Sequence, residues 1–185
     1  LTRKLGLECR HSIYELSKKG QPFLINLFIS STHVPFASEY PYYNLYTPPN
    51  YTGESRFIKK GKLSPEEIIK SQESDAEYNE INQVFNLYDG CVKEFDDEVG
   101  KIVKFLEKTN LIDNTIIILY SDHGTDFFET ACWGQGNTLI GNDPSGRIPL
   151  IISGPGLPKN TIFKPICRSI DLMPTLLDVL KYKIP

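Results

Sequence analysis

The stretch TIIILYSDHG, residues 115–124, decides the fold of this chain because an apolar run passes directly into a polar turn. A short, continuous run of apolar residues is typical of a strand that is buried on both faces of an α/β sheet. Asp122 and His123 follow the strand, and Gly124 lets the chain turn away sharply. Open α/β sheets bind ligands beyond the carboxyl ends of their strands, so the sequence predicts a site at this turn.

The rest of the chain supplies further elements of the same fold class. Apolar patterns predict strands over 23–29 and 148–152 and helices over 8–19, 74–106 and 172–180. The long helix followed by the strand over 115–120 is the alternation of an α/β protein with a mostly parallel sheet. Glycine-rich residues 125–146 and tyrosine-rich residues 34–53 are predicted to be loops. The tyrosine-rich loop either lines a substrate entrance or packs over the edge of the sheet.

Composition excludes several classes of function. The chain has 185 residues, 40% hydrophobic and 23% charged, which fits one ordinary globular domain. Its net charge of -3 offers no concentrated basic face for nucleic acid. No apolar run approaches the roughly 20 residues of a transmembrane segment. The four cysteines form no close pair, so we expect free and mostly buried thiols. Neither the compartment nor the oligomeric state is indicated.

Two of the predicted strands lead into a histidine, which suggests one shared crevice. His33 follows the strand over 23–29, and His123 follows the strand over 115–120. A carboxylate beside an imidazole suits a divalent cation that polarises an ester oxygen. Asp122 and His123 would face opposite sides of an extended strand, so the turn at Gly124 must rotate one of them before both can bind one ion. The alternatives are a loop carboxylate with a surface histidine, and a structural role for His33.

Several segments together resemble the sulfatase family of the alkaline phosphatase superfamily. They are residues 113–124 (DNTIIILYSDHG), 147–156 (RIPLIISGPG) and 171–177 (DLMPTLL), with 32–36 (THVPF) and 96–100 (DDEVG) upstream. The resemblance implies an α/β/α sandwich of the alkaline phosphatase type. It also implies that residues 1–185 are the middle and C-terminal part of one catalytic domain whose N-terminal part is missing.

The resemblance also implies roles for individual residues. Asp122 would be a metal ligand, and His123 lies where many sulfatases have an asparagine ligand and where related phosphonate and phosphodiester hydrolases have a histidine. An amide oxygen suits Ca²⁺, whereas an imidazole favours Mn²⁺ or Zn²⁺. His33 would contact the sulfate or phosphate group as a hydrogen-bond donor or proton shuttle. Gln135 and Asn137 either bind the substrate through neutral hydrogen bonds or belong to a glycine-rich loop packed under Trp133.

The family's nucleophile is a formylglycine made from a cysteine or serine in a short motif, and none of the four cysteines of this chain lies in that motif. The formylglycine is therefore expected outside this chain, and the fragment alone is expected to be inactive. The sequence favours a metal-dependent sulfatase that acts on a small-molecule or glycan sulfate ester. The alternatives are a phosphonate monoester or phosphodiester hydrolase, a phosphoryl-group transferase, and a catalytically inert binding relative on the same scaffold.

Overall fold

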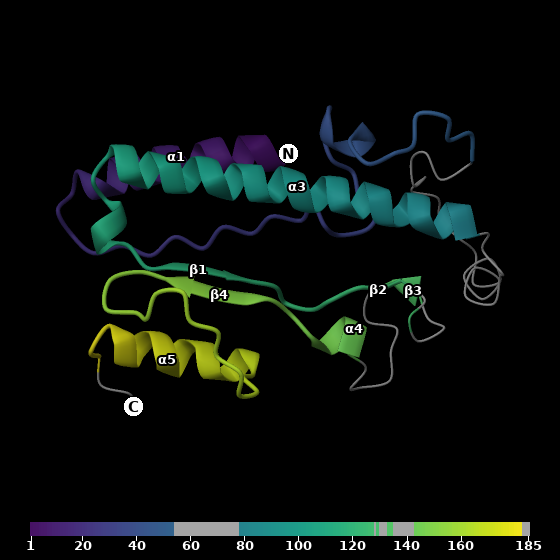
Figure 1. The fold of residues 1–185 in the computed structure, drawn as a ribbon. Coiled ribbons are helices and arrows are strands. Elements are labelled where there is room, and N and C mark those ends of the chain that lie inside the picture. The colour runs from purple at the N-terminus through teal and green to yellow at the C-terminus, as the bar shows by residue number, and fades with distance from the viewer. Residues whose placement is uncertain (54–77, 128, 130–132, 135–142, 183–185) are drawn as a thin grey trace.

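The described part of the chain forms three layers. The computed structural model describes residues 1–53, 78–127, 129, 133–134 and 143–182. Helices α1 (Thr2–Ser17) and α3 (Tyr78–Lys108) lie on one side of strands β1 (Ile117–Tyr120) and β4 (Leu150–Ser153), as Figure 1 shows. Helix α5 (Leu172–Val179) lies on the other side of these strands. This order confirms the predicted helix, sheet and helix layers.

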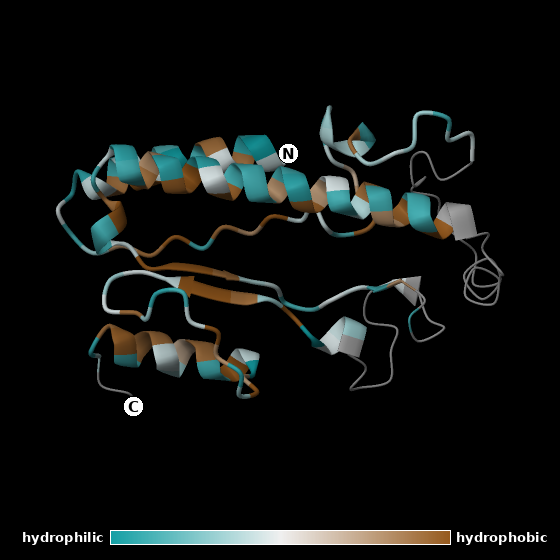
Figure 2. Cartoon of the chain, in the orientation of Figure 1, coloured by the Kyte–Doolittle hydropathy of each residue, from teal (hydrophilic) through white to brown (hydrophobic). Residues whose placement is uncertain are grey.

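The residues around β1 alternate between the two helical layers. Ile117 packs on the side of α1 and α3, while Ile116 and Ile118 line a small apolar cavity together with residues of α5. Successive side chains of a strand point to opposite faces, so an uninterrupted apolar run serves both layers. In Figure 2 most of β1 and β4 is coloured as hydrophobic.

The pairing of β1 with β4 is antiparallel, so this pair departs from the parallel pairing that the sequence predicts for most of the sheet. Ile118 lies opposite Ile152, and Tyr120 lies opposite Leu150. The second ladder, between β2 (Asp126–Phe127) and β3 (Trp133–Gly134), is antiparallel too. The chain leaves β1 at Tyr120 and re-enters the sheet beside that same end at Leu150. Such a return needs no crossover helix, and it reverses the direction of the second strand.

Residues 23–29 run extended beneath the helices, but the structure assigns no strand to them. Ile25 and Leu27 pack against the cluster of Cys9, Ile13 and Leu106, whereas Leu24 and Phe28 are 78% and 70% exposed. The alternation is that of a strand with one covered face. The strand prediction for 23–29 fails because the segment forms no backbone ladder with another described strand, although it runs in the same direction as β1 in Figure 1.

Helix α1 begins at Thr2, several residues before the predicted start at residue 8. The early turns contain Gly6, which lowers helix propensity, so the sequence pattern is weak there. Tertiary packing compensates, because Thr2, Gly6, Cys9 and Ile13 form one buried stripe. A side chain at Gly6 would collide with the Glu98 carboxylate of α3, so glycine leaves room for this buried carboxylate beside α1.

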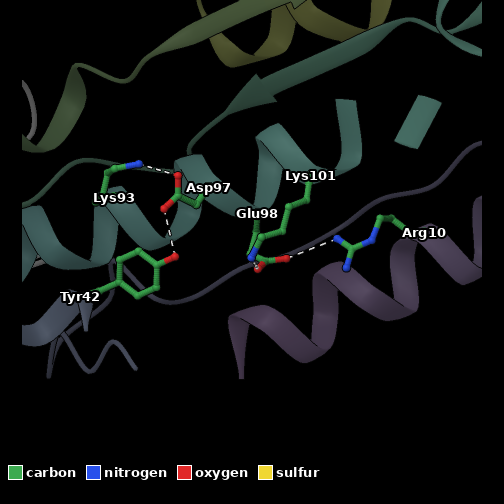
Figure 3. A network of polar contacts seen from close by, with 6 residues as sticks. All are labelled: Arg10, Tyr42, Lys93, Asp97, Glu98 and Lys101. Carbon is green, nitrogen blue, oxygen red and sulfur yellow. Dashed lines mark hydrogen bonds and ion pairs between the residues drawn. The ribbon is translucent and has the colours of Figure 1, made fainter. Parts of the chain in front are cut away.

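Helix α3 carries a buried stripe that mixes apolar and polar residues. Its buried members are Gln83, Leu87, Gly90, Cys91, Glu94, Glu98 and Leu106. Glu98 is 2% exposed and lies 3.4 Å from the Arg10 guanidinium of α1, while Lys101 holds its other oxygen (Figure 3). Gln83 donates a hydrogen bond of 2.9 Å to Thr47. These partners satisfy the side chains of Glu98 and Gln83, whereas Oε2 of Glu94 is buried without a hydrogen-bond partner among the described residues. No described helix is long and apolar enough to cross a bilayer.

The tyrosine-rich loop packs on α3 and not over the edge of the sheet, while its place at a substrate entrance stays a prediction. Its short helix η1 (Tyr42–Asn44) lies against α3, and the Tyr42 hydroxyl donates a 3.0 Å hydrogen bond to Asp97, which also pairs with Lys93 (Figure 3). The hydrogen bonds from Lys93 and Tyr42 lower the pKa of the Asp97 carboxyl. The Tyr42 carbonyl sits directly over Gly90, so the loop reaches the helix where no side chain intervenes.

The described cysteines are free thiols, as predicted. Cys9 and Cys91 are buried and Cys167 is exposed, while Cys132 lies outside the described residues. Burial raises the pKa of the Cys91 thiol to about 11, which keeps it protonated at neutral pH.

We expect Gly90→Ala to destabilise the protein by about 1–3 kcal/mol, because the added methyl group collides with the Tyr42 carbonyl. Urea unfolding measures the effect. Gly100→Ala is the matched control on the same helix, since nothing lies within 4 Å of its added methyl group. There the better helix propensity of alanine should leave stability unchanged or raise it by up to about 1 kcal/mol. Equal stability of the two variants would contradict the proposed contact.

Candidate functional site

The turn after β1 is held by hydrogen bonds within its own residues. The Ser121 hydroxyl donates to the carbonyl oxygen of His123 at 2.7 Å, and the backbone N–H of His123 donates to the Asp122 Oδ1 at 3.0 Å. Together these two hydrogen bonds bend the chain at the end of the strand. They also orient the Asp122 carboxylate, because its Oδ1 accepts one of them. The other oxygen, Oδ2, is left for an external partner.

The same turn orients the His123 ring. Its Nδ1 lies 2.9 Å from the carbonyl oxygen of Gly124, and a carbonyl can only accept, so we assign the proton to Nδ1. Nε2 then carries the lone pair, and it lies 3.7 Å from the Asp122 Oδ2. The turn therefore rotates the adjacent side chains toward one another, as the sequence required. Ligand distances of about 2.0–2.2 Å would let both atoms reach one ion of the Zn²⁺ type.

The charge of the turn suits a cation. Partial burial raises the pKa of the Asp122 carboxyl, but hydrogen bonds from backbone amides and the nearby His123 outweigh it, so the net pKa is lowered. Asp122 is therefore ionised at neutral pH, and both side chains are open to solvent, at 64% and 41% exposure. Among the described residues no third His, Cys, Asp or Glu joins them in a group that could hold a metal ion. The pair fits a metal as part of a ligand set.

Gly124 ties this turn to the segment before β4. Its N–H donates to the Ser145 carbonyl at 2.8 Å, and a side chain at Gly124 would collide with the Pro144 carbonyl. Both residues belong to the short helix α4 (Asp143–Gly146). A glycine is thus needed at position 124 because two backbone segments approach closely there. The sequence alone had suggested a different reason, namely a sharp turn.

His33 lies in a separate turn, in which the ring is oriented in the same way as that of His123, by the carbonyl of the next residue. Its Nδ1 is 2.7 Å from the Val34 carbonyl, so Nδ1 again carries the proton and Nε2 is left for a ligand. The ring is exposed and lines an open hollow of about 260 Å³ with Ser30, Ser31 and Pro35 among its neighbours. Asp122 and His123 do not line this hollow. Within the described residues no hydrogen bond or ion pair joins His33 to that pair.

What connects the two turns is a cluster of aromatic side chains that the sequence analysis missed. Phe36 follows His33 and Phe127 follows His123, each by a few residues, and their ring centroids lie 5.6 Å apart. Phe85 and Tyr88 of α3 complete the cluster. A signal was present in the sequence, since each histidine is followed at short range by a phenylalanine, but only the fold shows that the rings meet.

The remaining predicted site residues are not placed. Gln135 and Asn137 lie outside the described residues. Their substrate-binding role, and the alternative of packing under Trp133, stay predictions.

The comparisons with known proteins identify a family. The sulfatase family model matches residues 9–182. Choline-sulfatase of Rhizobium meliloti (strain 1021) is 26% identical over 178 residues, which cover 90% of this chain and 34% of that protein. The multifunctional alkaline phosphatase superfamily protein PehA of Trinickia caryophylli is 28% identical over 192 residues, covering 93% and 37%. The chain thus spans about a third of the length of these relatives.

Solved structures agree with this result. The phosphonate monoester hydrolase SpPMH of Silicibacter pomeroyi superimposes with a TM-score of 0.62 at 26% identity, over 83% of this chain and 33% of that chain. The yidJ structure of Bacteroides fragilis gives a TM-score of 0.72 at 24% identity, over 96% and 36%, which supports the fold alone. The fold is therefore of the alkaline phosphatase-like type that the sequence predicted.

We expect Gly124→Ala to lower the free energy of unfolding by about 1–3 kcal/mol, because the added methyl group displaces Pro144 and breaks the hydrogen bond from Gly124 to Ser145. Urea unfolding of the full-length protein checks this. Gly146→Ala serves as the control in the neighbouring helix, where nothing lies within 4 Å of the added methyl group. A Gly124 variant as stable as the Gly146 variant would show that the two segments do not make this contact.

Proposed function

The chain belongs to the sulfatase family, and on that basis we propose that the full-length protein hydrolyses a sulfate ester with a bound divalent metal ion. The observation that carries the proposal is the Asp122–His123 pair, whose Oδ2 and Nε2 lie 3.7 Å apart at the end of β1. The expected substrate is a small-molecule or glycan sulfate ester.

Asp122 and His123 would hold the metal ion through Oδ2 and Nε2. When bound, such an ion stabilises the charge that develops on the sulfuryl oxygens. The hydrogen bonds of the turn support this role, because Gly124 fixes the ring orientation through Nδ1 and backbone amides keep the carboxylate ionised. The imidazole ligand makes Mn²⁺ or Zn²⁺ competitors of Ca²⁺ at this site.

His33 would bind the sulfate group and move a proton. Its Nδ1 is engaged with the Val34 carbonyl, so Nε2 is the atom that faces a ligand. In its protonated form Nε2 donates to a sulfate oxygen, and its proton can pass to the leaving alcohol. Gln135 and Asn137 remain proposed as neutral donors to the substrate. The formylglycine nucleophile would come from a part of the protein that this chain does not contain.

A second candidate is hydrolysis of a phosphonate monoester or phosphodiester on the same scaffold. His123 favours it, because an imidazole ligand is less typical of sulfatases than of such hydrolases. The similarity to a phosphonate monoester hydrolase supports the same candidate, without exceeding the support for a sulfatase. A phosphoryl-group transferase or an inert binding relative would share the fold. The transferase would pass a phosphoryl group to an acceptor, and the inert relative would turn over no ester.

We expect Asp122→Ala and His123→Ala each to lower the affinity of the full-length protein for its metal by roughly 10- to 100-fold or more. The test is elemental analysis for Ca, Mn and Zn after equilibration with each ion. Asp113→Ala and His11→Ala are matched controls, because they remove an exposed carboxylate and an exposed imidazole elsewhere. Full metal content in both site variants would remove Asp122 and His123 from the metal site.

A substrate panel on the full-length protein distinguishes the chemistries. We expect turnover of aryl sulfates, with a large loss in His33→Ala, since that variant lacks the proposed proton donor. Tyr14→Ala, which removes an exposed ring from α1, is a control for general damage. Turnover of phosphodiesters or phosphonates without turnover of sulfates would favour the second candidate. No turnover of any ester by a metal-loaded protein would favour the inert relative.

A further inference from the structure

The two histidine turns meet through one pair of buried rings. Phe36 is 2% exposed and Phe127 is 7% exposed, and their centroids lie 5.6 Å apart with an interplanar angle of 31°. Each ring follows its histidine closely in the sequence, His33 in one case and His123 in the other. The contact thus connects the segments that carry the proposed sulfate-binding and metal-binding turns.

Helix α3 supplies the other side of this contact. Phe85 stacks on Phe127 with centroids 4.6 Å apart. Tyr88 meets both loop rings edge to face, at 5.4 Å from Phe36 and 5.1 Å from Phe127. Such geometries are favourable beyond the burial of area alone. Because Phe36, Phe127 and Tyr88 touch one another pairwise, neither loop ring can shift without disturbing the other.

The backbone between each histidine and its ring leaves little freedom. On one side, the Phe36 N–H donates to the His33 carbonyl at 3.0 Å, and Phe36 has a φ of 54°. A bulky residue is seldom found in that left-handed region, so contacts with the surrounding structure must hold Phe36 there. On the other side, the Gly124 N–H is fixed by Ser145, and Phe127 pairs with Trp133 in the β2–β3 ladder.

We propose that Phe36 and Phe127 are positioning residues, which set the place of His33 relative to Asp122 and His123 through their shared packing on α3. The catalytic consequence rests on the proposed function, whereas the coupling between the two turns does not. Neither ring needs to touch the substrate. The two rings instead keep the proton donor and the metal ligands at a fixed separation. A misplacement of about 1 Å at such a site lowers the rate on the order of 100-fold.

Hydrogen exchange tests the coupling without any turnover. In the full-length protein, Phe127→Leu should speed amide exchange at His33 and Phe36 about tenfold, although these amides lie in the other loop. In the reciprocal variant, Phe36→Leu should speed exchange at His123 and Gly124. Phe105→Leu is the matched control, because Phe105 packs in the separate cluster of Cys9, Ile13 and Leu106. It should leave all four amides unchanged.

Two results would overturn the proposal. One is faster exchange only within the loop that carries the substitution, and the other is an equal effect of Phe105→Leu. If Phe127→Leu fails to fold, Phe127→Met replaces it, because methionine removes the ring but is flexible enough to fill the space. Its effect is measured by exchange at the same amides.

Kinetics on a sulfate ester test the catalytic consequence. Each leucine variant should lower kcat by about 10- to 100-fold with little change in KM, and the double variant should lose far less than the product of the single losses. Independent, multiplicative losses would contradict a shared positioning role. A wild-type protein without sulfate-ester turnover would refute the proposed function, while the exchange result would still decide whether the two turns are coupled.

Discussion

The burial of one stripe of helix α3 is the constraint on which the rest of the structure depends. The two described segments that carry candidate site residues reach this helix, the His33 turn through Phe36 and the Asp122 turn through Phe127. At its other end the helix buries Leu106 against α1 and the extended residues 23–29. A long amphipathic helix gains most of its stability from such packing, so the site and the fold rely on the same contacts.

Polar residues within the stripe give this packing one register. Glu98 is buried between Arg10 and Lys101, and Gln83 is bonded to Thr47, so sliding α1 or the tyrosine-rich loop along α3 would leave a buried polar group without its partner. Leaving a buried charge unpaired costs far more than the pair contributes. Two glycines add to this arrangement, because Gly90 admits the Tyr42 backbone and Gly6 leaves room for the Glu98 carboxylate.

The candidate site combines local and distant control. Hydrogen bonds within residues 121–124 orient Asp122 and His123, and a single short-range contact orients His33. These local features are encoded by a few neighbouring residues. The separation between the two turns is not, since it depends on rings that come from two loops and one helix. Neighbouring residues thus orient each functional side chain, and tertiary packing sets the distance between the two turns.

Apolar periodicity and short motifs are local properties, so the sequence alone predicts the helix, strand and helix layers, the place of Asp122 and His123 at a strand end, and the family. It did not determine that β1 and β4 pair antiparallel, that residues 23–29 form no ladder with another described strand, or that α1 starts at Thr2 despite Gly6. Those features, and the meeting of Phe36 with Phe127, depend on partners distant in sequence. Only the tertiary structure brings such partners together, since burial and backbone pairing are settled between segments rather than within them.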